Sequence, residues 1–407
     1  MSILNTETAR LAGQGREGAG PTVELIGADA ALADDPLLNR WHELLDYGSR
    51  LNRVWSSPRI FSDQHGKAPL QENCVAVVRD EHGAVVGLCP IVHWRLTLPF
   101  QFRRRILGRI RLRAATILGG EPLLPPDPAL HERLFAALDA GLPWCDCIYI
   151  NSMPVGSFIA KFIYQQGELH KRFLVHPVRL EPREWIYLEL GSSMDEFLRE
   201  KQKRTRNTLK RRVKKLREHG GGALECIRVE HEDQVDAFYT AALAVAERSW
   251  QFQSLGQCLE ETALYQESLR NQARLGSLRA YLLNCGGKPC AFVIGYQEDD
   301  VLQFEQTAYA AEFAHYSPGT VLYFLLLEDL YHHRKPSFVN HGVGTTPHKR
   351  IFTNRTAQDA CVHLFRPTLR NRLRCLSHQA FYAGLKLAKR IRSRPAPQNM
   401  GEDESDD

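Results

Sequence analysis

The chain has 407 residues, of which 43% are hydrophobic and 24% are charged, and its formal net charge is +5. A chain of this length and composition is expected to bury two or three cores, which argues against an intrinsically disordered protein. No apolar run approaches the roughly 18 residues of a membrane-spanning helix, and the first residues lack the apolar segment of a signal peptide, so a cytoplasmic protein is expected.

The N-terminal part of the chain is predicted to form a first folded unit over residues 23–178. Residues 1–22 are rich in glycine, alanine and polar residues and are expected to be disordered. The elements expected next are a strand at 23–26, a helix at 35–51, a hairpin of 75–79 and 85–91, a helix at 129–142, a strand at 147–150 and a helix at 158–166.

Residues 95–113 are an unusual part of this unit because they contain seven arginines and no acidic residue. Apolar residues, among them Leu98, Phe100 and Ile106, are interspersed with the arginines. One interpretation is a basic patch with apolar insertions on a membrane surface. The other is a solvated strand-and-loop face in which the arginine stems cover apolar surface.

The cysteines give no sign of a metal site. Ten are present, and the closest pair, Cys145 and Cys147, is spaced too tightly for a zinc knuckle. Reduced, buried thiols in a cytosolic protein are the simplest interpretation, and no metal ion is expected.

A second unit is predicted over residues 179–367. After a strand at 181–190, Ser193 is expected to cap a helix that runs to about residue 219 and stops at a run of glycines. Eleven basic residues and one acid lie within 199–217, and like charges this dense repel one another unless an anion or neighbouring acids balance them. An ordinary solvated helix face is the alternative.

The centre of the second unit is predicted to be an antiparallel meander. Gly286-Gly287 separates two apolar runs, which is typical of a hairpin because the turn needs positive φ angles. The elements expected in this unit are a strand at 224–229, helices at 233–249 and 259–275, meander strands at 278–283, 290–296 and 301–309, a helix at 318–330, a strand at 337–340, the loop 342–344 and a closing strand at 361–366.

The meander and the segment after it carry a family resemblance. The matching pieces are Gly287-Lys288-Pro289-Cys290-Ala291-Phe292, Ala308-Tyr309 with Phe313, Tyr316-Ser317-Pro318-Gly319-Thr320, and Gly342 followed by Lys349-Arg350 with Phe352. Together they resemble the GNAT acetyltransferases, in the branch of the cellulose-biosynthesis-type (CelD/BcsL-like) and FemAB-like enzymes. The resemblance implies an α/β (α+β) fold of tandem GNAT-like domains, each a mixed sheet with an antiparallel meander flanked by helices, the first one degenerate.

The resemblance also implies acyl-CoA as co-substrate, with no permanently bound cofactor. The edge of strand 301–309 would pair with the pantetheine amides, and the helix N-terminus within 313–320 would take the pyrophosphate. The implied cofactor-binding residues are Gln306, Thr307, Phe313, Ser317, Gly319 and Thr320. His315 is the only potential cation of this loop, which departs from the ordinary GNAT loop and leaves aminoacyl-tRNA open as the donor.

Strand alternation predicts that Gln303, Glu305, Thr307 and Tyr309 share one face. Glu305 is the candidate general base, and the alternative is a structural partner of a lysine or arginine. Tyr309 and Tyr316 are candidate acids for the leaving thiolate, although core or capping roles are as probable for both. His341 is an alternative base, or simply a satisfied loop histidine.

The acceptor is expected to contact basic residues. Arg204 and Arg211 of the basic helix, and Lys349 with Arg350 in the final loop, are the candidate substrate-binding residues. Residues 368–394 are predicted to form a basic amphipathic helix that docks on the protein or binds a membrane or RNA, and 395–407 an acidic, disordered tail.

Three functions remain open from the sequence. The first is an acyltransferase that moves an acyl group, acetyl by preference, from acyl-CoA to an amine or hydroxyl of a cell-envelope, polysaccharide-related, glycan- or lipid-linked, or small-metabolite acceptor. The second is a Fem-like peptidyltransferase that uses aminoacyl-tRNA. The third is a non-catalytic protein that binds anionic membrane or RNA. For all three functions, peripheral contact with the inner face of the membrane is open.

Overall fold

The computed structural model describes residues 20–67, 73–102, 105–165, 167–178, 181–250, 252, 259–344 and 347–392. The predicted disordered tail 395–407 lies outside these residues, and so does most of 1–22. Those two predictions therefore stay predictions.

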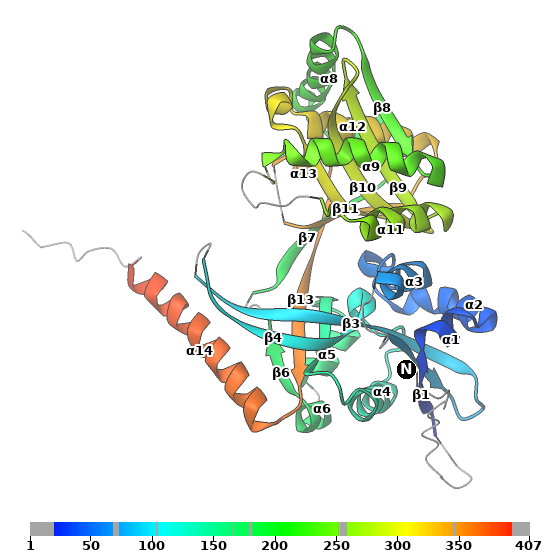
Figure 1. Ribbon diagram of the computed structural model, residues 1–407, viewed down its shortest axis with the longest axis vertical. Helices are drawn as coiled ribbons and strands as arrows, with labels where there is room; N and C mark the ends of the chain where they lie inside the picture. Colours follow the sequence, from blue (N-terminus) through cyan, green and yellow to red (C-terminus); the bar gives the residue numbers. More distant parts are fainter. Residues whose placement is uncertain are drawn as a thin grey trace, which may run out of the picture.

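The elements predicted for the first half appear in the predicted order (Figure 1). Its strands are β1 (Thr22–Gly27), β2 (Cys74–Arg79), β3 (Val85–Phe102), β4 (Arg105–Ile117), β5 (Cys147–Pro154) and β6 (Leu174–Pro177). Its helices are α1 (Ala28–Leu32), α2 (Asp35–Leu44), α3 (Pro58–Lys67), α4 (Pro128–Gly141), α5 (Phe158–Gln165) and α6 (Gly167–Arg172), with 3-10 turns η1 (Leu45–Tyr47), η2 (Arg50–Asn52) and η3 (Leu118–Gly120). The structure thus adds β4, β6, α1, α3 and α6 to the predicted elements.

The second half repeats this arrangement. Its strands are β7 (Arg183–Glu189), β8 (Leu224–Val229), β9 (Leu278–Cys285), β10 (Lys288–Glu298), β11 (Val301–Tyr309), β12 (Phe338–Val343) and β13 (Arg355–Phe365). Its helices are α7 (Met194–Glu200), α8 (Lys203–His219), α9 (Glu232–Glu247), α11 (Ala263–Arg274), α12 (Pro318–His332), α13 (Pro347–Ile351) and α14 (Leu369–Arg392), with the 3-10 turn η4 (Ala311–Tyr316).

Each half contains the same supersecondary unit. Four antiparallel strands lead through one crossover helix to a parallel fifth strand, which gives β1–β4, α4 and β5 in the first half and β8–β11, α12 and β12 in the second. Within the described residues the strands form one sheet in the order β1-β2-β3-β4-β5-β13-β7-β12-β11-β10-β9-β8, with β6 on β13. Strands β13 and β7 lie at the centre of the sheet, and the two repeats extend from them in opposite directions, each with its fifth strand innermost. The expected tandem mixed-sheet fold is confirmed.

Strand β13 joins the two halves. Its first part, from Arg355 to Asp359, pairs with β7, and its second part pairs with β5 and β6 of the first half. Figure 1 shows it as the long orange strand running through both halves. The sequence predicts a boundary between the two units near residue 178. Residues 355–365 belong to the second unit in sequence, but they also complete the sheet of the first unit.

Helices cover both faces of the second half. Helices α9 and α11 lie in front of β9 and β10 in Figure 1, with Phe238 of α9 against Phe292 of β10. Helix α12 covers the other face, where Tyr323 meets Phe304 of β11 with ring centroids 5.3 Å apart. Among the described residues, none of the helices has both the length and the apolar character needed to cross a membrane.

The long basic helix predicted from Ser193 to residue 219 is wrong in one respect, because it is two helices. Lys201 has an extended ψ of 146° and ends α7 before α8 begins. The break lets Phe197 of α7 stack on Phe352, at 6.3 Å, while α8 packs along α12. Tertiary packing thus overrides a continuous helix-forming sequence.

Other predicted boundaries differ at the ends of elements. The helix expected at 35–51 ends at Leu44 and continues as 3-10 turns, and the helix expected from 259 begins at Ala263 after the cap Thr262. Residues 95–113 belong to the long β3–β4 hairpin. Helix α3, with no prominent apolar periodicity, is absent from the prediction.

Candidate active site

The candidate site lies where the two parallel strands β11 and β12 separate. Strand β11 pairs with β12 at three positions, the last being Gln303 with Asn340. From there β11 continues to Tyr309, still bonded to β10 on its other side. Strand β12 instead turns to β7 with a register irregularity beyond Asn340. Among the described residues, β12 therefore does not pair with the edge of β11 from Phe304 onward, and an extended ligand could pair with that edge.

A β-bulge lies where the two strands separate. Ile294 of β10 pairs with Gln306 and the next residue, Gly295, pairs with Phe304, so Glu305 is the extra residue. A Cβ on Gly295 would lie 2.7 Å from the carbonyl oxygen of Gln303, so only glycine fits opposite the bulge. Bulges are frequent beside active sites because they redirect one side chain.

The bulge corrects the prediction that four alternate residues of this strand share one face. Directly paired residues of antiparallel strands share a face, so Ala308 shares that of Phe292, which packs against α9. Its neighbour Tyr309 lies beside Gly319 of α12, where a Cβ would be 3.6 Å from the ring. Glu305 contacts Tyr265 of α11, on the α9 side. Glu305 and Tyr309 are therefore on opposite faces.

Two tyrosines orient the carboxylate of Glu305. The hydroxyls of Tyr265 and Tyr296 donate to its Oε2 over 3.0 and 2.8 Å. Burial, reinforced by this carboxylate, raises the pKa of both tyrosines well above the usual range, so they are hydroxyl donors at any physiological pH. The Glu305 residue is exposed. The two hydrogen bonds hold the carboxylate in one orientation at the strand edge.

The N-terminus of α12 lies at the far end of this strand edge. Ser317, predicted as the N-cap, occupies that position in a left-handed conformation (φ 57°), and its hydroxyl makes no capping hydrogen bond. Pro318 is the first helical residue, as predicted. A 15-residue helix directs its positive dipole end and backbone N–H groups at this corner.

Helix α8 brings Arg212 and His219 to this corner; the sequence points to an anion on this basic helix but not to these two residues. The Arg212 guanidinium donates to the Thr320 hydroxyl over 3.4 Å. The His219 ring stacks on Tyr316 with centroids 4.4 Å apart. Arg212 is three residues after Leu209 and four before Leu216, the buried positions of α8. This spacing at the border of the apolar stripe is the signal that could have identified it.

The implied cofactor-binding residues are distributed along the edge and the corner. Gln306 is half-buried after the bulge, and the Thr307 hydroxyl donates to the Phe292 carbonyl over 3.0 Å. Phe313 is buried in η4 with its ring 5.8 Å from His219. Gly319 and the buried Thr320 form the first turn of α12. The structure thus brings all six to one edge, together with the half-buried Tyr309 and Tyr316.

His341 of β12 and Lys349 of α13 lie next to the point where β12 separates from β11. His341 is buried between the rings of Phe304 and Tyr323, and its Nε2 lies 2.8 Å from the Phe352 carbonyl. Lys349 donates to the His341 carbonyl over 2.7 Å, and burial lowers the pKa of its amine. Both side chains are thus engaged by the protein, whereas Glu305 is exposed.

Arg204 and Arg211 lie together on the outer face of α8. They line a hollow of about 520 Å³ with Lys203, Asn207 and Thr208. All five residues belong to one helix, so the hollow is a space between long side chains. Arg350 is exposed on α13. The three cations of the hollow on α8 are Lys203, Arg204 and Arg211. They suit an anionic group that binds away from the α12 corner.

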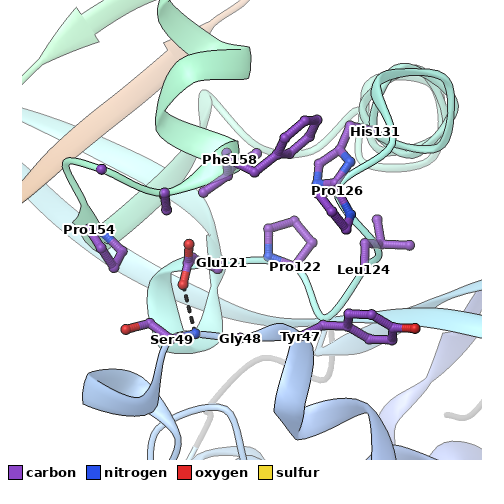
Figure 2. Close-up of a pocket in the computed structure, with 13 residues that line it drawn as sticks. Tyr47, Gly48, Ser49, Glu121, Pro122, Leu124, Pro126, His131, Pro154 and Phe158 are labelled. Carbon is purple, nitrogen blue, oxygen red and sulfur yellow. Dashed lines mark hydrogen bonds between the residues drawn. The ribbon is translucent and has the colours of Figure 1, made fainter.

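The corresponding corner of the first half is closed. Strand β4 pairs with β5 through its last four residues, from Ala114 to Ile117, so no strand edge separates. A hollow of about 370 Å³ lies beside it (Figure 2), lined by Glu121 and by apolar residues that include Pro122 and Phe158. Burial raises the pKa of Glu121, which accepts the Ser49 backbone N–H over 2.8 Å.

Within the described residues, no group of three or more histidine, cysteine, aspartate or glutamate side chains could hold a metal ion. The nine described cysteines are unpaired thiols.

The second half contains a meander with a bulged strand, a crossover helix, and a parallel strand that separates from the meander. These features define the GNAT fold. The protein is an acyltransferase. Residues 203–350 match the family model described as an acetyltransferase (GNAT) domain. The match covers α8 through α13 and includes Glu305, the α12 corner and Lys349.

Solved structures of similar fold cover both halves of the chain. FemX aligns over 84% of this chain and 98% of its own with a TM-score of 0.55 and 10% identity. The C-terminal domain of a putative lysylphosphatidylglycerol synthetase from Agrobacterium fabrum gives 0.49 and 11%, covering 84% and 95%. A tandem GNAT protein from the clavulanic acid biosynthesis pathway gives 0.46 and 14%, covering 84% and 98%. A comparison with curated protein sequences finds no match.

Proposed function

We propose that this protein transfers an acyl group, acetyl in the first instance, from acyl-CoA to an amine or hydroxyl of an acceptor. The observation that carries the proposal is the β11 edge, which leaves β12 after Gln303 and leads to the N-terminus of α12. Such an edge can pair with the amides of pantetheine, and the helix N-terminus with Arg212 can take the pyrophosphate.

In the proposed reaction the acceptor attacks the thioester carbonyl directly. The carbon–sulfur bond breaks as the new carbon–nitrogen or carbon–oxygen bond forms. Glu305 removes the proton of the nucleophile, and the leaving CoA thiolate takes up a proton from solvent. Tyr309 and Tyr316 lie beside the α12 corner, at the phosphate end of the donor. The α12 corner holds the phosphates away from this chemistry, and His341 keeps the loop after β12 in place.

The acceptor is proposed to be anionic and related to the cell envelope or to polysaccharide synthesis. Arg204 and Arg211 face one hollow on α8, and Arg350 is exposed on α13. Phosphate or carboxylate groups of a glycan- or lipid-linked precursor suit these cations. The motif resemblance to the cellulose-biosynthesis-type branch supports the same acceptor class.

Calorimetry with acetyl-CoA, a longer acyl-CoA and free CoA tests the donor. We expect binding heat with all three, since the pyrophosphate and pantetheine contacts are common to them. Desulfo-CoA is the matched control for thiol reactivity. Absence of heat with every CoA species, combined with retention of the protein on immobilised tRNA, would remove acyl-CoA as the donor.

A Fem-like transfer from aminoacyl-tRNA is the second candidate. It is favoured by the similarity to FemX across both halves of the chain and by the eleven basic residues of 199–217. Electrophoretic mobility shift with charged and uncharged tRNA tests it, since a donor site should prefer the charged form. Equal binding of both forms, weakened alike by salt, would indicate non-specific phosphate contacts.

A further inference from the structure

Helix α14 has two different apolar faces. One docks on the β3–β4 hairpin: Cys375 and His378 are buried there, and the Tyr382 hydroxyl donates to the Pro99 carbonyl over 3.0 Å. The ring of Phe381 packs on Phe100 at 5.4 Å. The predicted docking of this helix on the protein is therefore present.

The opposite face of α14 is an exposed apolar stripe. Its six residues follow one another at intervals of four and three, and the four leucines are 59–74% exposed. The stripe consists of Leu369, Leu373, Leu376, Ala380, Ala383 and Leu387. At 1.5 Å per residue it runs for about 27 Å. A stripe this long on a monomeric surface marks an interaction site.

The hairpin tip extends the apolar surface at one end of the helix. The Tyr382 hydroxyl accepts the backbone N–H of Gln101, which places the last turns of α14 near the tip. There Phe102, Ile106 and Leu107 are exposed, the last by 64%. Figure 1 shows α14 on the same outer side of the molecule as the ends of β3 and β4 that adjoin this hairpin.

The charges around the stripe are all positive. Helix α14 contains no aspartate or glutamate, and the exposed Arg370, Arg372 and Lys386 flank the stripe. The hairpin likewise carries arginines and no acid over 95–113. Apolar side chains that enter an acyl layer, flanked by cations that reach phosphate headgroups, are what a helix lying in an anionic bilayer surface requires.

A second copy of α14 is a poorer occupant, although the spacing is that of a coiled coil. The positions beside the stripe hold arginine, serine, glutamine, glycine and lysine, so no interhelical ion pair can form and the cations repel. Two alanines at the centre of the stripe also make a thin core. A nucleic acid would use the cations and leave the leucines without a role.

We propose that α14 and the β3–β4 tip form a docking surface for a membrane that exposes anionic phospholipid headgroups. This surface places the acyltransferase at a bilayer and does not depend on the reaction proposed above, because vesicle binding requires no acyl donor.

Vesicle flotation of the full chain tests the surface. We expect capture by phosphatidylcholine vesicles with about 30% phosphatidylglycerol and little capture by phosphatidylcholine alone. The double substitution Leu373→Ser, Leu376→Ser should lower the partition coefficient about tenfold or more. The matched control is Leu264→Ser, Leu275→Ser on α11, which are exposed by 49% and 37% and should bind as the unmodified chain does.

Three results would overturn the proposal. The first is no capture by either vesicle, and the second is capture that the α14 double substitution leaves unchanged. The third is a concentration-dependent dimer in size-exclusion chromatography that the same substitution abolishes, which would assign the stripe to a second copy. Since the substituted leucines are solvent-exposed, circular dichroism should show an intact fold in each variant.

Discussion

At the scale of single residues, Glu305 has the most specific environment in the molecule. An extra strand residue places its carboxylate, and two buried tyrosine hydroxyls fix the orientation of that carboxylate. Hydrogen bonds from hydroxyls stabilise the ionised form and restrict the rotamers of the side chain. The two tyrosines come from different elements, Tyr265 from α11 and Tyr296 from β10.

Substitution Glu305→Gln keeps the size of the side chain and removes the base. We expect kcat for acyl transfer to fall about 10²–10⁴-fold while the affinity for acetyl-CoA stays the same. Steady-state kinetics and calorimetry on one preparation check both values. Glu312→Gln, an exposed glutamate of η4 paired with Arg248, is the control. An unchanged kcat would remove Glu305 from the mechanism.

Arg212 tests the phosphate corner. Arg212→Ala should raise the Kd for CoA about fivefold to tenfold, because a charge-assisted hydrogen bond to phosphate contributes about 1–1.5 kcal/mol. Lys214→Ala, on the exposed side of the same helix, should leave the Kd unchanged. Pantetheine, which has no pyrophosphate, should bind both variants equally. If it discriminates between the variants, Arg212 acts elsewhere.

At the scale of elements, the sequence predicted the strands and helices whose pattern is local. The glycine pair at 286–287, the Ser317-Pro318 start and the meander strands are all where periodicity and turn residues indicated. The bulge at Glu305 could not be predicted, since it depends on how Gly295 of the next strand fits against it. The break at Lys201 likewise depends on Phe197 finding Phe352.

Three buried histidines attach α14 to the sheet and make this attachment pH-dependent. His378 of α14 lies 3.1 Å from His176 of β6, beside His363 of β13. Burial, together with the neighbouring histidines, lowers the pKa of His176 to about 4 and that of His363 to about 3. Burial also lowers the pKa of His378. Two other titratable side chains pack against these histidines: Tyr149 against His363, and Tyr382 against His378.

Acid should therefore weaken the fold around α14. Unfolded histidines bind protons near pH 6.5, before the folded ones do, so stability is full above that pH and falls toward pH 4 and 3. The expected slope is about 1.4 kcal/mol per pH unit for each histidine. Urea unfolding from pH 7 to 5 measures it, and His363→Leu should reduce the slope. His82→Leu, at an exposed turn, should not.

At the scale of the whole molecule, the two halves are joined by β13 within one sheet and by charged contacts between residues 50–59 and residues 298–300. Glu298 of the β10 end is buried, and Arg59 of α3 lies 3.3 Å from it. Burial raises the pKa of Glu298, while Arg59 and His42 oppose that rise. Arg53 donates to Asp299 over 2.9 Å, and Arg50 pairs with Asp300 at the surface.

This arrangement predicts that the halves unfold together. Arg59→Ala leaves the buried Glu298 carboxylate without its arginine, and should lower the free energy of unfolding by about 2–3 kcal/mol. Asp300→Asn removes an exposed partner and should cost under about 1 kcal/mol. Calorimetry should show one transition in each variant, because β13 pairs with strands of both halves. Two separated transitions would mean that β13 does not couple them, and would give the second half, with Glu305 and the α12 corner, a stability of its own.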